Sequence, residues 1–273
     1  MNVEKIVVER VTVYVGRFRV NTVVYRDIAF DPNVGSNVYH DIKTVFITHG
    51  HADHFGDACK INAKIVAPKL ESNLIEDPRI CRRGLFSWAM LPENLVTPHF
   101  MGEGVRVDDF AENYAISIPL PGHTYAHTGY LIENVLIAGD SIHLVECWER
   151  FGVLYYTDPD SAIESLNKIR KLDWDYIVPG HGGILNRDEG VKIVKENIKR
   201  IEKVDKTILS IIDEEGLTES EILAEAMNAF GVTSTMAALN TLKPAISGHL
   251  SSLYQRNLIT VELSEKGLVF KRR

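Results

Sequence analysis

The chain has 273 residues, of which 45% are hydrophobic and 25% charged, which suits one large globular domain or a large domain with a small one. The formal net charge of -7 argues against a protein whose main task is to bind phosphate backbones. No apolar run reaches the roughly 18 residues of a transmembrane helix, and three widely spaced cysteines favour free thiols in a reducing compartment. We therefore expect a cytoplasmic protein without a membrane partner.

The first part of the chain predicts a layered α/β domain. The N-terminal segment reads as a strand, and Asp158 with Pro159 predicts the start of a helix. Several β-rich runs are apolar throughout, as expected for strands covered on both faces. Further strands are predicted at residues 11–15, 19–25, 44–48, 64–67, 114–118, 129–132, 135–138 and 176–178.

After residue 185 the pattern is mostly helical. Asn186 with Glu189 predicts a capping box that starts a long helix, and Thr218 with Glu221 predicts another. A third helix is expected to start at Pro244, because proline favours the first turn of a helix.

The C-terminal segment LITVELSEKGLVFKRR predicts a hairpin with Gly267 in its turn. Helices followed by a two-stranded wing are typical of a winged-helix domain. The sequence therefore predicts a large N-terminal domain at residues 1–204 and a small winged-helix-like domain at residues 205–273.

Residues 48–54 read T-H-G-H-A-D-H, directly after the apolar run VFI. His49 and His51 flank one residue, so in an extended or loop conformation their side chains point the same way and can bind one cation. Asp53 and His54, expected at the start of the next helix, face a second cation. Imidazole and carboxylate suit zinc, iron, manganese or cobalt.

A catalytic metal site needs further ligands from other segments. The sequence offers three candidates, each at the end of an apolar run: PGHT with His123, AGDS with Asp140 and PGHG with His181.

These motifs resemble the metallo-β-lactamase superfamily, including its glyoxalase II-like and endoribonuclease-like branches. The resemblance spans residues from about 10 to 185 and also takes in Asn21 and Asp31. It implies a four-layer αββα sandwich with the site along one edge of the β-sandwich. With the tail, the expected fold is this α/β sandwich followed by a small winged helix.

The resemblance also implies a dinuclear site for two divalent metal ions, zinc first, with iron or manganese as alternatives. One metal is bound by His49, His51 and His123, the other by Asp53, His54 and His181, and Asp140 bridges the two.

Such a site predicts hydrolysis. Two cations about 3.5–4 Å apart share a bridging water and lower its pKa, which gives a hydroxide nucleophile. One cation also polarises the carbonyl or phosphoryl oxygen of the substrate. Asp53 is the candidate catalytic residue, because it can orient the attacking water or give a proton to the leaving group.

The superfamily hydrolyses many substrates, so its branches have to be separated by other features. The bridging aspartate at 140 departs from true β-lactamases, and the complete second ligand set disfavours the mononuclear persulfide dioxygenases. Glyoxalase II-like thioesterases share every ligand but carry a helical C-terminal extension. Quorum-quenching lactonases have a tyrosine at the position of His143, and the endoribonuclease branch has a similar winged-helix tail.

Three residues are candidates for substrate binding: His143, Arg82 and Trp88. His143 is equally typical of a residue that supports the ligands or lies at the surface. Arg82 and Trp88, in CRRGLFSWAMLPENL, predict either a substrate wall with a cation for an acidic group or a surface helix. The aromatic residues of WERFGVLYY (148–156) leave the same two interpretations open.

The tail is not strongly basic. Residues 200–273 hold nine Lys or Arg and ten Asp or Glu, which is poor for counterion-release binding. The tail can equally serve dimer contacts or wall the active site, so RNA and a second copy of the chain are both candidate partners beside a small-molecule substrate.

The leading hypothesis is a dinuclear metal-dependent hydrolase of a small ester, thioester or lactone that uses the metal-bridging hydroxide. One alternative is an endoribonuclease that uses the winged helix to hold RNA. The other is a winged-helix regulator whose metal site senses and does not catalyse.

Overall fold

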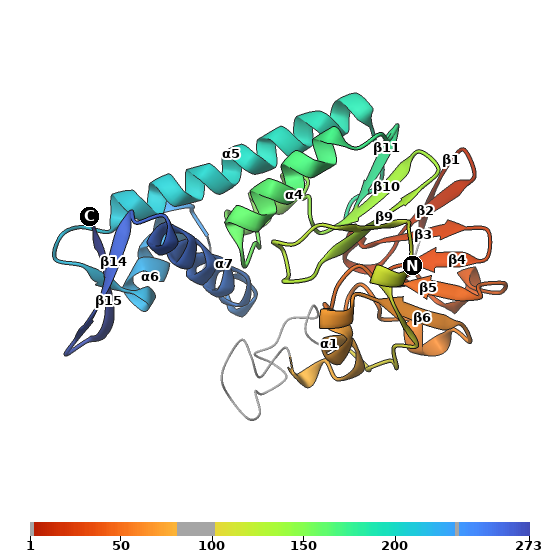
Figure 1. Cartoon of the computed structure of the whole chain (residues 1–273), viewed down its shortest axis with the longest axis horizontal. Helices are drawn as coiled ribbons and strands as arrows, with labels where there is room; N and C mark the ends of the chain where they lie inside the picture. The colour runs from red at the N-terminus through yellow and green to blue at the C-terminus, as the bar shows by residue number, and fades with distance from the viewer. Residues whose placement is uncertain (1–2, 81–101, 233–234) are drawn as a thin grey trace.

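The computed structural model of the chain describes residues 3–80, 102–232 and 235–273. Two β-sheets lie face to face, and the C-terminal segment extends from one side of this sandwich at the end of a long helix (Figure 1). None of the helices in these ranges is long and apolar enough to cross a membrane.

The first sheet has seven strands in sequence order. Its first four strands pair antiparallel and the remaining ones parallel. The strands are β1 (Glu4–Val8), β2 (Val11–Val15), β3 (Asn21–Tyr25), β4 (Ile28–Phe30), β5 (Thr44–Phe46), β6 (Lys64–Ala67) and β7 (Asp109–Phe110).

The second sheet has five strands in the order β12-β11-β10-β9-β8. Only β10 and β11 pair in parallel. The strands are β8 (Ser117–Pro119), β9 (Thr128–Ile132), β10 (Val135–Gly139), β11 (Tyr176–Pro179) and β12 (Leu185–Asn186).

Aromatic side chains fill the space between the sheets. Phe30, Phe46 and Tyr130 are buried, and their ring centroids lie 5.1–5.4 Å apart. The Tyr130 hydroxyl donates to the carbonyl of Ile47 at 2.7 Å, so the one polar atom of this aromatic group is satisfied. The contact also ties the second sheet to the residue that precedes the T-H-G-H-A-D-H segment.

Helices cover the outer faces, which gives the four-layer αββα sandwich expected from the sequence. On the five-stranded side lie α3 (Val145–Phe151), α4 (Pro159–Lys171) and α5 (Arg187–Ile211). On the seven-stranded side the described residues contribute α1 (Ser72–Glu76) and short turns.

The helix starts follow the predicted capping residues. Asp158 accepts a hydrogen bond from the Ser161 N–H at 3.0 Å at the start of α4. The capping boxes predicted at Asn186 and at Thr218 are both present.

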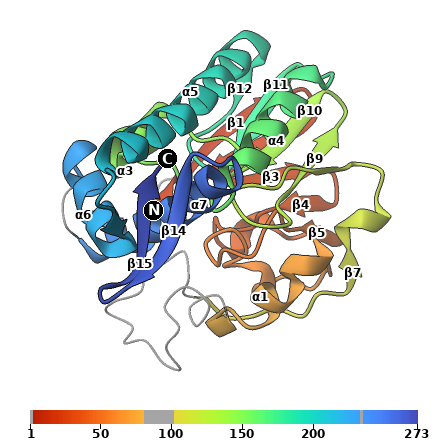
Figure 2. The same ribbon diagram turned by 60° about the vertical axis from the view of Figure 1, so that its left-hand side comes forward.

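The C-terminal segment has its own hydrophobic core, and Figure 2 shows it stacked at the end of α5. Its helices α6 (Glu219–Ala229) and α7 (Met236–Gln255) are followed by a hairpin of β14 (Ile259–Ser264) and β15 (Gly267–Arg272), to which β13 (Leu217–Thr218) adds. The predicted order of helices and hairpin is present, and the winged-helix assignment stays a prediction.

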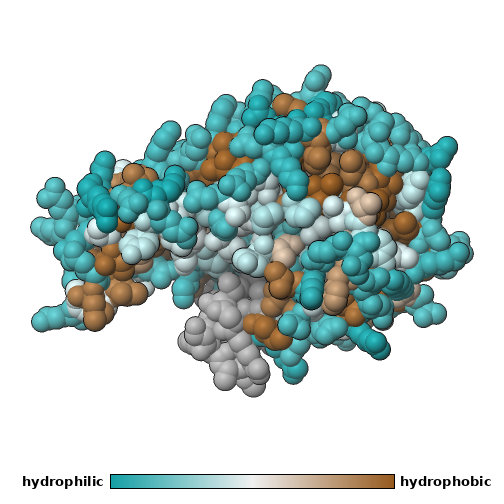
Figure 3. Space-filling model, in the orientation of Figure 1, coloured by the Kyte–Doolittle hydropathy of each residue, from teal (hydrophilic) through white to brown (hydrophobic). Residues whose placement is uncertain are grey.

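The two cores share one helix. α5 runs without a break across the predicted domain boundary, and its Ile201 packs into the sandwich core while Val204 and Ile208 pack into the C-terminal core. At the far end of the molecule the hairpin exposes Leu263 and Leu268, where Figure 3 shows apolar surface.

Three local predictions are wrong. The last helix starts at Met236 and contains Pro244, because burial of its apolar face outweighs the roughly 3 kcal/mol that an interior proline costs. Asp53 and His54 lie in turns that lead to a short 3-10 helix at Ala58–Lys60, not at the start of an α-helix. The strand expected at residues 114–118 begins only at Ser117, after a 3-10 turn.

Candidate metal centre

The predicted metal ligands lie on loops that leave the strands at one edge of the sandwich. His49 and His51 follow β5, His123 lies between β8 and β9, Asp140 directly follows β10, and His181 follows β11. Loops that follow strands of both sheets therefore place these side chains close together at one edge of the sandwich.

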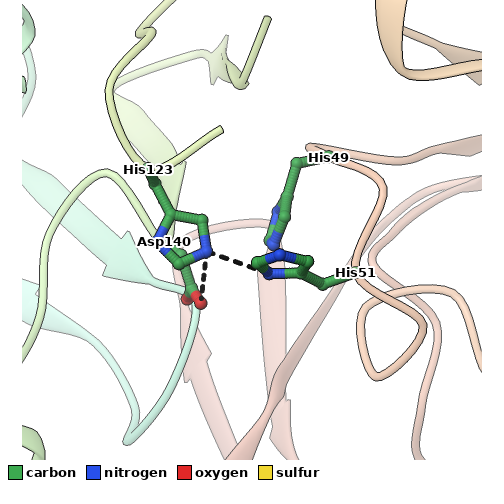
Figure 4. A group of neighbouring side chains, drawn as sticks. All are labelled: His49, His51, His123 and Asp140. Carbon is green, nitrogen blue, oxygen red and sulfur yellow. Dashed lines mark hydrogen bonds and ion pairs between the residues drawn. The ribbon is translucent and has the colours of Figure 1, made fainter. Parts of the chain in front are cut away.

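The structure brings one group of four possible ligands together. Donor atoms of His49, His51, His123 and Asp140 all lie within 4.8 Å of one another, and all four side chains are buried. His123 Nε2 lies 3.0 Å from His51 Nδ1 and 3.4 Å from Asp140 Oδ2 (Figure 4). Nitrogens and an oxygen that converge in this way suit one cation.

A second group consists of Asp53, His54 and His181, whose donor atoms also lie within 4.8 Å of one another. Asp140 Oδ2 lies 3.5 Å from His54 Nε2 and 3.6 Å from His181 Nε2. Asp140 thus contacts members of both groups, as the resemblance implied for a bridging carboxylate.

The outward nitrogens of four histidines are held by oxygen atoms. Such a contact fixes the ring orientation and leaves Nε2 to face the cluster. The contacts are His49 Nδ1 to Thr48 Oγ1 (3.0 Å), His54 Nδ1 to Asp31 Oδ2 (2.9 Å), His123 Nδ1 to the Tyr155 carbonyl (2.8 Å) and His181 Nδ1 to the Phe18 carbonyl (3.0 Å).

Inward atoms of the cluster lack hydrogen-bond partners in the described part of the chain. These buried atoms include His49 Nε2, His54 Nε2 and Asp140 Oδ1. A buried polar atom without a partner costs about 1–3 kcal/mol, and coordination of cations would satisfy all three. The donor set and its orphaned atoms fit divalent metal ions.

His49 and His54 have pKa values that are shifted in opposite directions within the cluster. Burial lowers the pKa of His49 well below its usual value, and the neighbouring histidines lower it further, so the ring is held neutral, the form in which imidazole can bind a metal ion. Burial also lowers the pKa of His54, but the carboxylates of Asp140, Asp31 and Asp53 outweigh burial and raise it. The His54 ring therefore lies among more carboxylate charge than the His49 ring.

Two motif glycines make room for the cluster. A Cβ atom at Gly180 would lie 1.8 Å from Asp140 Oδ1, so the PGH motif needs its glycine. Gly139 has φ +53, and a Cβ atom there would lie 2.6 Å from His127 Nε2. The AGD motif therefore needs glycine for both backbone conformation and space.

Asp31 and Asn21, named by the resemblance, support the ligand loops. Asp31 accepts hydrogen bonds from the Thr48 N–H at 2.8 Å and the Thr48 hydroxyl at 2.7 Å. Asn21 donates to the carbonyls of Pro179 and Gly183 at 2.8 and 2.9 Å, on either side of His181.

Sequence reasoning missed two further residues. Glu71 is buried, and its carboxylate accepts from the N–H groups of Gly50 and Ala126 at 3.0 Å each, which holds two ligand loops together. His127 is buried with its ring centroid 5.0 Å from that of His49, and burial lowers its pKa to about 3. The spacing of His127 four residues after His123 was the available signal, whereas Glu71 has none.

Of the three residues predicted to bind substrate, the structure describes His143 alone. His143 is buried, and its ring centroid lies 5.4 Å from that of His123, at a pocket beside the cluster. Arg82 and Trp88 lie outside the described residues. Of the aromatic residues at 148–156, Phe151 and Tyr155 line the pocket, whereas Trp148 and Tyr156 belong to the sandwich core.

A four-layer αββα sandwich with histidines and aspartates gathered at one edge of its two sheets defines a class of metal-binding α/β proteins. The model of the metallo-beta-lactamase superfamily matches residues 40–181, which is more than half of the chain. The chain belongs to this superfamily.

Curated relatives match part of their own length. A hydroxyacylglutathione hydrolase of Vibrio campbellii is 29% identical over 136 residues, which cover 48% of this chain and 44% of that protein. A beta-lactamase-like protein 2 homolog of Caenorhabditis elegans is 28% identical over 205 residues, which cover 74% of this chain and 63% of that protein. The chain thus spans less than two thirds of each of these two relatives.

Solved structures share the fold over nearly the whole chain. A beta-lactamase domain protein from Burkholderia ambifaria has a TM-score of 0.68 at 16% identity and covers 99% of this chain and 94% of its own. A metallo-beta-lactamase family protein from Thermus thermophilus has a TM-score of 0.62 at 16% identity, with 100% and 98% covered.

Proposed function

We propose that the protein is a metal-dependent hydrolase that holds two divalent cations and cleaves a small ester, thioester or lactone. The position of Asp140 carries the proposal, because its Oδ2 lies 3.4, 3.5 and 3.6 Å from Nε2 of His123, His54 and His181. One carboxylate oxygen placed between two groups of ligands is the arrangement that a pair of cations needs.

His49, His51 and His123 would hold one cation, Asp53, His54 and His181 the other, and Asp140 both. Bound cations supply an activated water and polarise the oxygen of the scissile carbonyl. In the net reaction the water oxygen bonds to the carbonyl carbon, and the bond from that carbon to oxygen or sulfur breaks. The departing atom takes the electron pair and a proton, so the products are a carboxylic acid and an alcohol or thiol.

Two residues of the chain act on the reacting groups in this proposal. Asp53 is buried and belongs to the second ligand group, with Oδ2 3.9 Å from His181 Nε2. From there its carboxylate orients the attacking water or carries a proton to the leaving atom. His143 lines the pocket beside His123 and contacts the part of the substrate next to the scissile bond.

The choice of a carbonyl substrate is supported by the relatives named hydroxyacylglutathione hydrolase and by an apolar pocket at the cluster. The tail gives little support to an RNA substrate, since its acids outnumber its bases and nucleic-acid binding depends on released counterions.

The test is to load the protein with zinc, manganese or iron, count the metal by mass spectrometry, and assay thioesters, lactones, phosphodiesters and RNA. We expect close to two ions per chain and turnover of a thioester or lactone. Cleavage of RNA alone would point to the endoribonuclease, and selective binding of duplex DNA without turnover would point to the regulator. Either result, or one ion after full reconstitution, contradicts the proposal.

A further inference from the structure

A pocket of about 240 Å³ opens beside His123 and Asp140. Its walls come from α3, from residues 153–155 after it, from the turn that carries Phe18, and from Thr241 of α7. The pocket therefore lies at the junction of the sandwich and the C-terminal segment, and one end of it is the candidate metal centre.

The walls of this pocket are mainly apolar. Leu144, Phe151, Val153 and Leu154 line it. Val153 is 1% exposed and packs in the C-terminal core, whereas Leu154 is 5% exposed and packs in the sandwich core. Neighbouring wall residues are thus anchored in two different cores, which fixes the shape of the pocket. An apolar ligand that enters the pocket is removed from water, and the pocket does not have to rearrange to bind it.

His143 places a buried polar atom without a hydrogen-bond partner among the described residues at the pocket. His143 Nε2 makes no hydrogen bond to the residues that the structure describes. The backbone at His143 is fixed, because its N–H donates to Asn197 Oδ1 and its carbonyl accepts from Asn197 Nδ2, both at 2.9 Å. The ring is held at the pocket with one nitrogen available to a ligand, as donor or acceptor according to its tautomer.

Positive charge lies at the rim of the pocket. Arg19 and Arg150 are exposed and line it, and Glu146 is the exposed acid among the lining residues. Arg19 Nη2 donates to the Gly182 carbonyl at 3.3 Å, next to the ligand His181. The Arg150 guanidinium lies 5.1 Å from the centroid of the Phe151 ring. Both cations are held at the surface, outside the apolar walls.

We propose that this pocket binds an apolar acyl group, and that the leaving part of the substrate is anionic and lies against Arg19 and Arg150. The scissile carbonyl then lies between the ligand cluster and His143 Nε2. This inference rests on the proposed function and narrows it from any small ester, thioester or lactone to one substrate class. Thr241 makes α7, and with it the C-terminal segment, part of the wall that selects the acyl group.

The first experiment measures kcat/KM for acetyl, butanoyl, hexanoyl and octanoyl thioesters of glutathione with the metal-loaded protein. We expect kcat/KM to rise by about tenfold for each added pair of methylene groups until the pocket is full. Equal rates along the series, or the highest rate with acetyl, would overturn the inference.

A pair of variants places this preference in the pocket. Thr241→Phe fills the wall from α7 and should reduce the preference for octanoyl over acetyl at least tenfold. Thr207→Phe introduces the same side chain on α5, away from the pocket lining, and should keep the wild-type preference. Both should bind the wild-type amount of metal. An unchanged preference in Thr241→Phe, with metal content intact, would contradict the assignment.

His143 is tested by comparing His143→Phe with His143→Gln. Phenylalanine removes the hydrogen-bonding atom and should lower kcat for the hexanoyl thioester by about a hundredfold. Glutamine keeps such an atom and should recover part of that loss. Equal losses in the two variants at full metal content would mean that Nε2 does not contact the substrate.

The rim is tested by the ratio of kcat/KM for a glutathione thioester, which is anionic, to that for the neutral N-acetylcysteamine thioester of the same acyl group. The double variant R19Q/R150Q should lower this ratio about fivefold, because each exposed ion pair contributes a little more than about a factor of two. Arg106→Gln, at an exposed site elsewhere, is the control. A ratio that does not change refutes the role of the arginines.

Calorimetric titration with octanoate and acetate separates this inference from the proposed function. Tighter binding of octanoate than of acetate, lost in Thr241→Phe, supports the acyl pocket even if no thioester is hydrolysed. Hydrolysis of thioesters without any effect of chain length or of Thr241→Phe leaves the proposed function standing and overturns the acyl pocket.

Discussion

Two regions of the molecule bury histidine and carboxylate together, and they differ in how their polar atoms are satisfied. In the metal centre, Asp140 Oδ1 and the Nε2 atoms of His49 and His54 have no hydrogen-bond partner within the described ranges. In the second region, which we call the junction cluster (Asp205, His249 and Arg256), Asp205 Oδ1 lies 2.6 Å from His249 Nδ1 and Asp205 Oδ2 contacts the Arg256 guanidinium. The junction cluster already contains its cation.

The difference follows from where the side chains come from. The junction cluster joins α5 to α7, and beside it the Ser252 hydroxyl donates to Asp160 Oδ2 at 2.6 Å, which joins α7 to α4. Arginine keeps its charge at every physiological pH, so the buried carboxylate is compensated permanently. The metal centre uses loops at strand ends and histidines, which bind a cation only when one is supplied. The first arrangement supplies its own positive charge and stabilises the fold, whereas the second has the side chains to bind metal ions.

The largest expected effect distinguishes Asp140 of the metal centre from Asp205 of the junction cluster. Asp140→Asn should lower kcat/KM about a thousandfold or more, because losing about 4 kcal/mol of metal-dependent transition-state stabilisation is worth that factor. Its metal content, measured by mass spectrometry, should fall for both sites, since Asp140 contacts both ligand groups.

Asp205→Asn and His40→Ala are the matched controls for Asp140→Asn. The first changes a carboxylate of the junction cluster in the same way, and the second removes an exposed histidine outside both regions. Both should keep two ions per chain. Metal loss in all three variants alike would mean that the comparison between the regions is mistaken.

Removal of metal should destabilise the protein by its effect on the metal centre and should not affect the junction cluster. At a free metal concentration a thousandfold above the dissociation constant, binding adds about 4 kcal/mol to the free energy of unfolding. A chelator should therefore lower the melting temperature of the wild type and of Asp205→Asn by a similar amount. Asp140→Asn should respond much less, and an equal response there would show that Asp140 is no metal ligand.

Breaking the junction cluster should reduce stability without affecting metal. Asp205→Ala leaves Arg256 and His249 without their carboxylate, which should lower the free energy of unfolding by about 3 kcal/mol. Arg256 is partly exposed, so we expect the low end of the range for buried pairs. Urea unfolding of the metal-saturated protein measures the change, and Asp27→Ala, at an exposed ion pair with Lys43, should cost under about 1 kcal/mol.

The sequence indicates the histidines and aspartates that the structure groups at the candidate metal centre, because the signals for them are local. It does not indicate the junction cluster. The spacing of His49, His51 and His54 is readable within one short segment, and strand ends supplied the rest. Asp205 and His249 are 44 residues apart, and nothing in either segment points to the other.

Local rules also failed where tertiary packing decides. Pro244 predicts a helix start, yet the neighbouring Leu242, Ala245 and Ile246 are buried in the C-terminal core and keep the helix continuous. Glu71 in turn acts through backbone N–H groups of two distant loops, and any residue type except proline offers such a group. No sequence pattern therefore marks these partners.

The smallest expected effect is the pH dependence of the junction cluster. Burial raises the pKa of Asp205, but hydrogen bonds and charges from His249 and Arg256 outweigh burial and hold it below its usual value.

In the unfolded chain an aspartate has a pKa of about 3.9. Because the folded-state pKa is the lower one, the stabilising contribution of the Asp205 carboxylate is fully present above about pH 5 and is lost as the pH falls below about 4. The difference in the free energy of unfolding between the wild type and Asp205→Asn should therefore shrink as the pH falls from about 5 toward about 3. Urea unfolding across this range measures it, and because the metal centre is the same in both proteins, titration of its histidines cancels in the difference. A difference that grows toward acid would mean that Asp205 is not held ionised by its two neighbours, and the contrast between a region with its own cation and one that needs a metal would fail.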